Sequence, residues 1–511
     1  MARVARRVAA GIATRGSTGP AATVLRASGR FARRRRLRAD LLAEAAALEL
    51  SRGREPRGLV AAYAAELTCA DECYRAGAAG RAADSLIKAT RLAFHRVPHI
   101  DRLSSPLDAD PARYLGPLRS SSAAHAVAAP RGRRLPAAAP PTGRPLRLLV
   151  VTRGNANFLP LIISHYERHP NVELRHLDLA EDAAIAGVLD LRPMIEFALG
   201  GRPAYERDVE RVLRPHLDWA DTVFVEWCTI AAAFLTLIDP GTTRMVIRLH
   251  KYETYTYWPH CVDFSRVDDL VFVSEPMRDL TIAALPRLTG ANAPRLPVIA
   301  NAMDLAAFRR PKRPEARFTV GLVGMGQIAK DPRWAVDVLR RLRSRDPRYR
   351  LLIMGGGFDP ESSAAARHYH DLLARDLSEL EPSGAVLRLG HVDDVPAAFT
   401  DVGVILSSSV RESFHCGLVE GAAGGAVPVV RDWPCFARQP SGARTLFPAD
   451  WVVASPREAA ERILAATADE ESWHKTGQAA ADHALGAWDW SVVRHDFDRL
   501  LLRQTQGKAR R

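Results

Sequence analysis

The stretch GVILSSSVRESFHCGLVEGAAGGAVPVV, from Gly403 to Val430, carries the clearest pattern in the chain. It begins with a short apolar run that is typical of a buried strand. An acid, an aromatic residue and a helix with a second acid follow, and a Gly-Gly turn leads into a Pro-Val-Val strand. Strand–helix–strand units of this kind build parallel sheets. The stretch therefore predicts an α/β domain.

The segments before it repeat the alternation. Residues 311–485 contain the apolar runs FTVGLVG, YRLLIMGGG and AVLRLG, with the helical pattern WAVDVLRRLRS after the first. They predict one Rossmann-like lobe. Residues 146–310 contain LRLLVV, VELRHL, DTVFVEW, RMVIRL, DLVFVS and LPVIAN and predict another. A short basic, proline-containing hinge (RRPKRPEA, 309–316) joins the two. We expect an α/β fold of two Rossmann-like lobes that face a cleft at the carboxyl ends of both sheets.

The first 145 residues differ in composition. Residues 1–39 contain eleven Arg and no Asp or Glu, which predicts a disordered basic arm, with weak contact to an anionic membrane as the alternative. Residues 40–129 show helical periodicity, so an α-helical region should precede the lobes. Residues 130–145 form a proline-rich linker, and residues 486–511 a closing helix and a basic tail.

Charge and cysteine usage limit the partners and the compartment. The net charge of +13 is concentrated at the two ends of the 511-residue chain, which argues against a nucleic-acid partner. The six cysteines are scattered, as in a reducing cytosol. No apolar run is long enough to span a bilayer. We expect a cytoplasmic protein, with peripheral attachment to the inner face of the plasma membrane as the alternative.

Two acids in the opening stretch are candidate site residues. Glu412 follows a strand and a loop, so it can reach the mouth of the cleft, and Glu420 lies in the first turns of the helix. Ser413, Phe414 and His415 turn the backbone into that helix, whose free N–H groups suit an anion. Carboxylates suit sugar or ribose hydroxyls, although two surface acids at this spacing are common by chance.

In its context, this segment resembles the E-x7-E motif of the large family of retaining nucleotide-sugar glycosyltransferases with the two-lobed GT-B fold. The resemblance implies that Glu412 contacts the donor sugar and that Glu420 binds the nucleotide ribose. It continues in LPVIANAMDLAAF, where Asn301 holds a matching place, and in LVGMGQIAKDP, which is similar to the phosphate-binding loop through Gly324 and Lys330.

The resemblance extends through most of the two lobes. LLIMGGG and LRLGHVDDVPAAF resemble the next strand and the segment toward the nucleobase pocket. WDWSVVRHDFDRLLL resembles the helix that crosses back to the first lobe. The likeness is good from residue 317 onward, looser over 146–310, and absent before 146. It makes the first lobe the acceptor lobe and the second the nucleotide-sugar lobe.

One position departs from the family pattern. Met325 stands where the family usually carries Arg directly after the first glycine of the loop. A departing diphosphate develops negative charge that two cations normally stabilise. Lys330 is one of them, and Arg333 or Arg411 is expected to supply the second.

The first lobe contributes further candidates. His250 ends a strand and matches the family histidine that approaches the reacting sugar. Gly154 and Asn155 follow the first strand, where a turn can approach donor or acceptor. Glu226 would be a costly charge within a strand unless it lies at the end that faces the cleft. The aromatic run KYETYTYWPH (251–260) is either an acceptor platform or, slightly favoured, interlobe packing.

The function expected from the resemblance is sugar transfer, with retention, from a nucleotide-diphosphate sugar to an acceptor hydroxyl. Neither a cofactor nor a metal is expected, since cationic side chains take the metal's place. The acceptor would be a sugar, a lipid-linked sugar or a small molecule, as in cell-surface polysaccharide or glycolipid synthesis. Two alternatives stay open: a sugar-nucleotide epimerase of the same fold, and a non-catalytic subunit that binds sugars or partner proteins.

Overall fold

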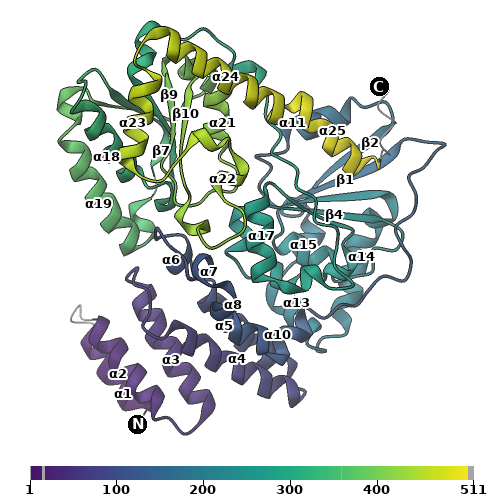
Figure 1. The fold of residues 1–511 in the computed structure, drawn as a ribbon. Coiled ribbons are helices and arrows are strands. Elements are labelled where there is room, and N and C mark those ends of the chain that lie inside the picture. The colour runs from purple at the N-terminus through teal and green to yellow at the C-terminus, as the bar shows by residue number, and fades with distance from the viewer. Residues whose placement is uncertain (1, 14–17, 358, 504–511) are drawn as a thin grey trace.

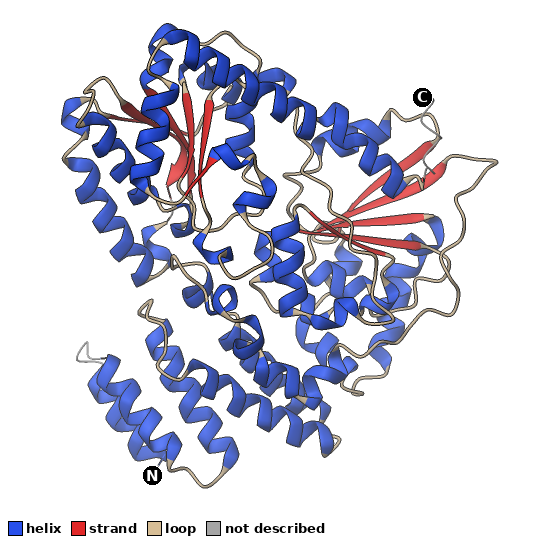
Figure 2. Cartoon of the chain, viewed as in Figure 1, coloured by secondary structure: helices blue, strands red, loops and turns tan. Residues whose placement is uncertain are grey.

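The chain forms two parallel-sheet lobes and a separate group of helices (Figure 1, Figure 2). The structure, a computed structural model, describes residues 2–13, 18–357 and 359–503. The first sheet has the order β2-β1-β3-β4-β5 and the second β11-β10-β9-β6-β7-β8, with parallel pairing throughout. The α/β fold with two Rossmann-like lobes, preceded by helices, is therefore confirmed.

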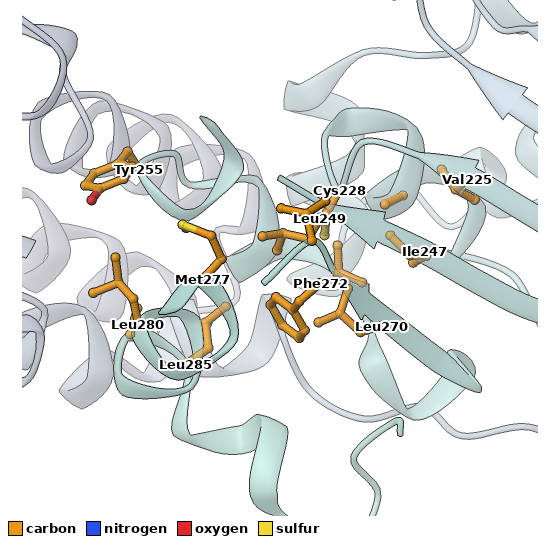
Figure 3. Close-up of a cluster of buried hydrophobic side chains, with 14 of the residues drawn as sticks. Val225, Cys228, Ile247, Leu249, Tyr255, Leu270, Phe272, Met277, Leu280 and Leu285 are labelled. Atoms are coloured by element: carbon orange, nitrogen blue, oxygen red, sulfur yellow. The ribbon is translucent and has the colours of Figure 1, made fainter. Parts of the chain in front are cut away.

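The first lobe is built on short, buried, mostly β-branched and aliphatic strands, as parallel sheets require. Its strands are β1 (Leu146–Thr152), β2 (Val172–Asp178), β3 (Thr222–Glu226), β4 (Arg244–Leu249) and β5 (Asp269–Phe272). Its helices are α11 (Pro160–Glu167), α12 (Ala183–Ala186), α13 (Leu191–Ala198), α14 (Ala204–Trp219), α15 (Ile230–Leu235), α16 (Lys251–Thr254) and α17 (Glu275–Ala284). Val225, Ile247 and Phe272 of this sheet belong to the same apolar cluster as Met277 of α17 (Figure 3).

The second lobe repeats the alternation. Its strands are β6 (Thr319–Met325), β7 (Arg350–Gly357), β8 (Val386–Gly390), β9 (Val404–Ser407), β10 (Val427–Arg431) and β11 (Val452–Val453). Its helices are α18 (Pro332–Arg343), α19 (Ala364–Ser378), α20 (Val395–Ala398), α21 (Cys416–Ala423), α22 (Ala443–Leu446), α23 (Pro456–Ala466) and α24 (Glu470–Trp488). α18, α19 and α23 share one apolar core with one face of the sheet, and α21 and α24 lie against the other.

The last described helix joins the second lobe to the first. α25 (Trp490–Leu501) buries Val493, Phe497 and Leu501 in the same core as Val150 and Phe224 of the first sheet. It follows α24 along the top of Figure 1. The domain boundary predicted at residue 485 lies inside α24, because the helix break occurs at Asp489, whose carboxylate caps α25. The basic tail from residue 504 lies outside the described residues.

Ten helices precede the lobes in the described part of the chain. They are α1 (Ala2–Ala13), α2 (Thr18–Arg30), α3 (Arg35–Leu50), α4 (Leu59–Arg75), α5 (Ala79–Ala93), α6 (Arg96–His99), α7 (Pro106–Ala109), α8 (Pro111–Tyr114), α9 (Gly116–Ser120) and α10 (Ser122–Val127). We call residues 2–129 the helical region. It lies beneath both lobes in Figure 1. None of the described helices is long and apolar enough to cross a membrane.

The prediction of a disordered arm over residues 1–39 is wrong for the residues that the structure describes. Arg and Ala both favour helix, and Ala22 and Leu25 of α2 pack against Leu41 of α3. Carboxylates that the arm itself lacks come from α3, where Glu44 pairs with Arg6 at 2.6 Å. The charge count of residues 1–39 therefore did not reveal that α1 and α2 have an apolar face that packs against α3. Residues 14–17, also within the predicted arm, lie outside the described residues.

The helical region is tied to both lobes through one carboxylate. Asp108 of α7 accepts hydrogen bonds from the Tyr255 hydroxyl of the first lobe and, at 3.2 Å, from Arg411 of the second. Arg411 also donates to the carbonyl oxygen of His99. The linker from residue 130 runs along the first lobe, where the Gly132 amide donates to Ser265 at 2.9 Å. Three parts of the chain therefore meet at Asp108.

Candidate functional site

The two sheets present their carboxyl ends to each other where the lobes meet. β4 ends at Leu249 and is followed by His250 and Lys251 in the first lobe. β9 ends at Ser407, and the loop to α21 carries Glu412 in the second. Parallel sheets place ligands at such ends, because the connecting loops and the helix N-termini converge there.

Glu412 is the centre of the contact between the lobes. Its side chain is buried, with one oxygen 2.5 Å from Lys330 Nζ and the other 3.4 Å from Lys251 Nζ. The Ser409 hydroxyl donates to it at 2.7 Å. Burial works to raise the pKa of Glu412, but Lys251 and Lys330 outweigh it and hold the pKa well below its usual range. The carboxylate is therefore ionised and held between cations from opposite lobes.

Lys251 was missed by the sequence reasoning. It is the first residue of α16 and follows His250 directly, so it sits at the carboxyl end of β4. Burial lowers its pKa, and Glu412 partly offsets that effect. Its place after a strand end was a usable signal, but nothing local indicated that it would reach across to the other lobe.

Neither arginine proposed as the second cation lies free at this site. Arg411 is buried and bonded to the helical region, as described above. Arg333 on α18 pairs with Asp376 at 2.6 Å. Met325 is buried in the apolar core of the second lobe. The cation that joins Lys330 at Glu412 is Lys251 and neither of these arginines.

The loop that holds Lys330 is shaped by two unusual backbone positions. Gly324 has φ 75°, and a Cβ there would lie 4.0 Å from the Lys330 side chain. Asp331 has φ 41° and is paired with Arg431 at 2.6 Å. The Ser408 hydroxyl donates to the Lys330 carbonyl at 2.5 Å. The end of the loop that precedes α18 is thus fixed to the residue after β9 and to β10.

Helix α21 lies unusually close to the sheet because it carries glycines on its inner face. A Cβ on Gly417 would fall 2.7 Å from Val323, and one on Gly421 would fall 2.7 Å from Ile405. This contact places the helix N-terminus beside the phosphate-loop candidates. Glu420 is partly exposed on this helix, and burial raises its pKa to about 7.

His415 precedes this helix in the left-handed region, with φ 70°. Its side chain is 6% exposed, and neither ring nitrogen has a hydrogen-bond partner among the described residues. Burial, reinforced by Lys330, lowers its pKa to about 3, so the ring is neutral. Unpaired buried nitrogens are costly, which points to a ligand that completes them.

A second cluster lies at the carboxyl ends of β3 and β4. Arg248 donates two bonds of 2.8 Å to Glu226, and His250 Nε2 lies 2.8 Å from the same carboxylate. Burial opposes ionisation, but Arg248 and His250 lower the pKa of Glu226 to about 2. Glu226 therefore sits at the strand end, where its charge is paired.

Two aromatic rings cover His250. Phe158 stacks on it at 4.7 Å between ring centroids, and Trp227 approaches to 4.3 Å. Trp227 has φ 72°, which is strained for a bulky residue, and its indole donates to the Asn155 carbonyl at 3.2 Å. Sequence reasoning missed both rings, although Trp227 follows Glu226 directly.

The remaining predicted residues form hydrogen bonds around the site or pack in the core beneath it. The Gly154 amide donates to Asp178 at 2.8 Å in an open turn. Asn301 is buried, with its Nδ2 3.5 Å from Cys416 Sγ and its Oδ1 unpaired among the described residues. The Ser413 carbonyl accepts from Ser274 across the lobes. Phe414 packs against Trp488 in the core, so its side chain does not face a ligand.

The aromatic run after His250 is used mainly for packing. Tyr255 is buried against the helical region, and the His260 ring lies tilted against Phe94, with 5.1 Å between the ring centroids. Tyr252 is the exposed exception. No group of three or more His, Cys, Asp or Glu side chains among the described residues is arranged to hold a metal ion.

Comparison with solved structures fits this architecture. HepE of Anabaena in complex with UDP aligns with a TM-score of 0.52 and 16% identity, over 70% of this chain and all of that chain. A glycosyltransferase from Rickettsia africae aligns with a TM-score of 0.50 and 12% identity, over 71% of this chain and all of that one. The chain has the GT-B fold.

The GT-B lobes account for the part of the chain that carries both site clusters. At these identities the likeness establishes the fold and not the activity. No model of a protein family matches the chain, and no curated protein matches it. The function must therefore be argued from the side chains on the GT-B scaffold.

Proposed function

We propose that this GT-B protein is a glycosyltransferase that moves a sugar from a nucleotide-diphosphate sugar to an acceptor hydroxyl. The observation that carries the proposal is Glu412, an ionised carboxylate held between Lys330 and Lys251 of opposite lobes. Such a cluster can exchange its internal ion pairs for a ligand that carries both hydroxyls and phosphates. A sugar diphosphate has both.

The donor would lie along the second lobe. Glu420 on α21, eight residues after Glu412 in the sequence, would accept hydrogen bonds from the ribose hydroxyls. The free N–H groups at the start of α21 would receive the diphosphate. His415, neutral and with both ring nitrogens unpaired, would complete its hydrogen bonds with the donor. Glu412, released from its lysines, would orient the sugar through its hydroxyls.

The two lysines would stabilise the departing diphosphate. In the transfer step the bond between the anomeric carbon and the phosphate oxygen breaks, and a bond to the acceptor oxygen forms on the same face. The acceptor proton passes to the leaving phosphate, so no covalent enzyme intermediate is needed and configuration is retained. Charge builds on the diphosphate as the bond breaks, and preorganised cations favour that state. Lys251 would take the place that Met325 leaves empty.

The cluster around His250 would form the acceptor side. Glu226 fixes the orientation of the imidazole, and Arg248 balances the charge of Glu226. Phe158 and Trp227 would offer aromatic faces to the C–H surface of a sugar. The lobes would have to separate slightly for entry, because His250 is only 3% exposed here. Closure over the donor would then exclude water and limit hydrolysis.

The first experiment is thermal stabilisation by a panel of nucleoside diphosphates and nucleotide sugars. Wild type should respond to one base, and Glu420→Ala should lose that response. Release of the diphosphate should then require an acceptor and should be unaffected by chelators. Donor consumption without acceptor would favour an epimerase. No response to any nucleotide would contradict the proposal and favour a non-catalytic binding subunit.

The site of action would be the cytoplasmic face of a membrane, in polysaccharide or glycolipid assembly. Val4 and Val8 of α1 and Phe31 after α2 are exposed, by 63%, 45% and 80%, among arginines. Exposed apolar residues beside basic ones suit an anionic lipid surface. Wild type should sediment with anionic vesicles and not with neutral ones, and Phe31→Ser should weaken this. Equal sedimentation of the variant would argue against a role for this surface.

A further inference from the structure

An apolar pocket lies between the helical region and the first lobe, apart from the site described above. Its volume is about 300 Å³, at the lower end of the range for small-molecule sites. Leu86 and Ile87 of α5 and Val127 of α10 line it from the helical region. Ile195 of α13 and Leu285, after α17, line it from the first lobe. The exposed side chain of His125 lies on its rim, so solvent can reach it.

Two arginines line this otherwise apolar pocket. Arg119 of α9 donates to the carbonyl oxygens of Ala283 and Ala284. Arg287 donates to the carbonyl oxygens of Pro259 and Val262, at 2.7 and 3.3 Å. In both residues the Nε–H is buried and has no partner among the described residues.

No Asp or Glu belongs to the lining, and neither arginine forms an ion pair within the described part of the chain. Burial lowers the pKa of both arginines, and the charges of Asp110, for Arg119, and Asp263, for Arg287, offset this only in part. Burial lowers the pKa of Arg287 to about 10, so it remains charged near neutral pH. Both arginines are half-buried and lose part of their hydration, for which backbone carbonyls and the charges of Asp110 and Asp263 compensate only in part. An anion in the pocket would compensate for the remainder.

We propose that this pocket binds an amphipathic anion, with its carboxylate or phosphate at Arg119 and Arg287 and its apolar body against α5, α10 and α13. The guanidinium fork matches planar carboxylates and phosphates in geometry and charge. The aliphatic walls would bury the apolar body. The ligand is thus a molecule of the fatty-acid or alkyl-phosphate class.

The pocket and the candidate site share one segment of the chain. Tyr257 and Cys261 belong to its lining, and they lie on the same segment as Lys251, which starts α16. Occupancy would brace this segment against the helical region. The binding proposal itself does not depend on glycosyl transfer and can be tested without any nucleotide.

Calorimetric titration of the full chain with dodecanoate and dodecyl phosphate, below their micelle concentrations, tests the proposal. Wild type should bind at least one of them, with a higher melting temperature. Dodecan-1-ol and acetate, which each lack half of the ligand, should bind much more weakly. The two anions also distinguish a carboxylate head from a phosphate head.

Variants separate the pocket from nonspecific binding. Arg119→Gln and Arg287→Gln should each weaken binding about tenfold or more, as expected for a lost charged hydrogen bond. Ala124→Phe should block the cavity while leaving both arginines in place. Arg341→Gln, an exposed arginine on α18, is the matched control and should bind as wild type does. If Arg287→Gln fails to fold, Arg119→Gln and Ala124→Phe still decide the matter.

Three results would overturn the proposal. The first is no binding of either anion. The second is binding of dodecan-1-ol as tight as that of dodecanoate, which would leave the arginines without a role. The third is undiminished binding in the folded Arg119→Gln and Ala124→Phe variants, which would place the ligand elsewhere.

Discussion

Lys251 in the first lobe places its ammonium 3.4 Å from a carboxylate oxygen of Glu412 in the second lobe. Since the departing diphosphate would need a cation at this point, Lys251→Met should reduce kcat by about 100- to 1,000-fold, as for loss of one preorganised donor. The measurement is donor turnover in the presence of acceptor.

Lys475→Met, on the exposed surface of α24, is the matched control and should leave turnover unchanged. Nucleotide affinity distinguishes the two lysines further. Lys330→Met should weaken diphosphate binding even when the lobes are apart, because Lys330 belongs to the donor lobe itself. Unaltered turnover in Lys251→Met would remove Lys251 from the mechanism.

The pKa of about 7 at Glu420 predicts a pH dependence of nucleotide binding. The carboxylate must be ionised to accept bonds from both ribose hydroxyls, so affinity should rise with pH up to about 7 and then level off. Glu420→Gln should bind more weakly and without this dependence. Titration calorimetry from pH 5.5 to 8.5 makes the comparison.

The raised pKa of Glu420 also affects the stability of the ligand-free protein. The folded pKa lies above the ordinary value of 4.5, so folding favours the protonated form. This contribution is complete below pH 4.5 and is lost as the pH rises through about 7. The melting temperature of Glu420→Gln relative to wild type should therefore increase over that window. A constant difference would mean that Glu420 titrates normally.

Glu226→Gln should lower the free energy of unfolding by about 3 kcal/mol or more, because it leaves buried Arg248 without its counter-charge. Chemical denaturation measures this. Glu173→Gln removes an exposed carboxylate that pairs with Arg147 at 3.3 Å and should change stability by less than about 1 kcal/mol. Equal effects of the two variants would contradict the role given to burial.

Gly53→Ala should loosen the helical region from the second lobe. The added Cβ would lie 2.3 Å from the Ala365 amide nitrogen at the start of α19, and φ is +63°. A loss of about 1–3 kcal/mol and faster proteolysis of the linker at residues 130–145 are expected. Gly116→Ala meets no atom within 4 Å and should be neutral or slightly stabilising. Unchanged proteolysis would show that the lobes do not depend on this contact.

The local sequence pattern was sufficient to predict the two α/β lobes. Buried strands such as Leu146–Thr152 and Val404–Ser407 read as short apolar runs, and their alternation with helices identified both sheets. The same reasoning failed for residues 1–39, because an arginine-rich segment finds its acids and its apolar partners on α3 and α4. Such partners are not visible within the segment itself.

The sequence by itself determined the two-lobed α/β architecture, because periodicity is a local property of the chain, and its resemblance to a glycosyltransferase motif made Glu412, Glu420 and Lys330 the candidate site residues. Only the tertiary structure decided that Lys251 joins Lys330 at Glu412, while Arg411 is used to hold the helical region. The Lys251–Glu412 pair joins residues 161 positions apart in the two lobes, and the Arg411–Asp108 pair joins residues 303 positions apart. Electrostatic energy depends on the final distance and burial of the charges, and the order of residues along the chain sets neither.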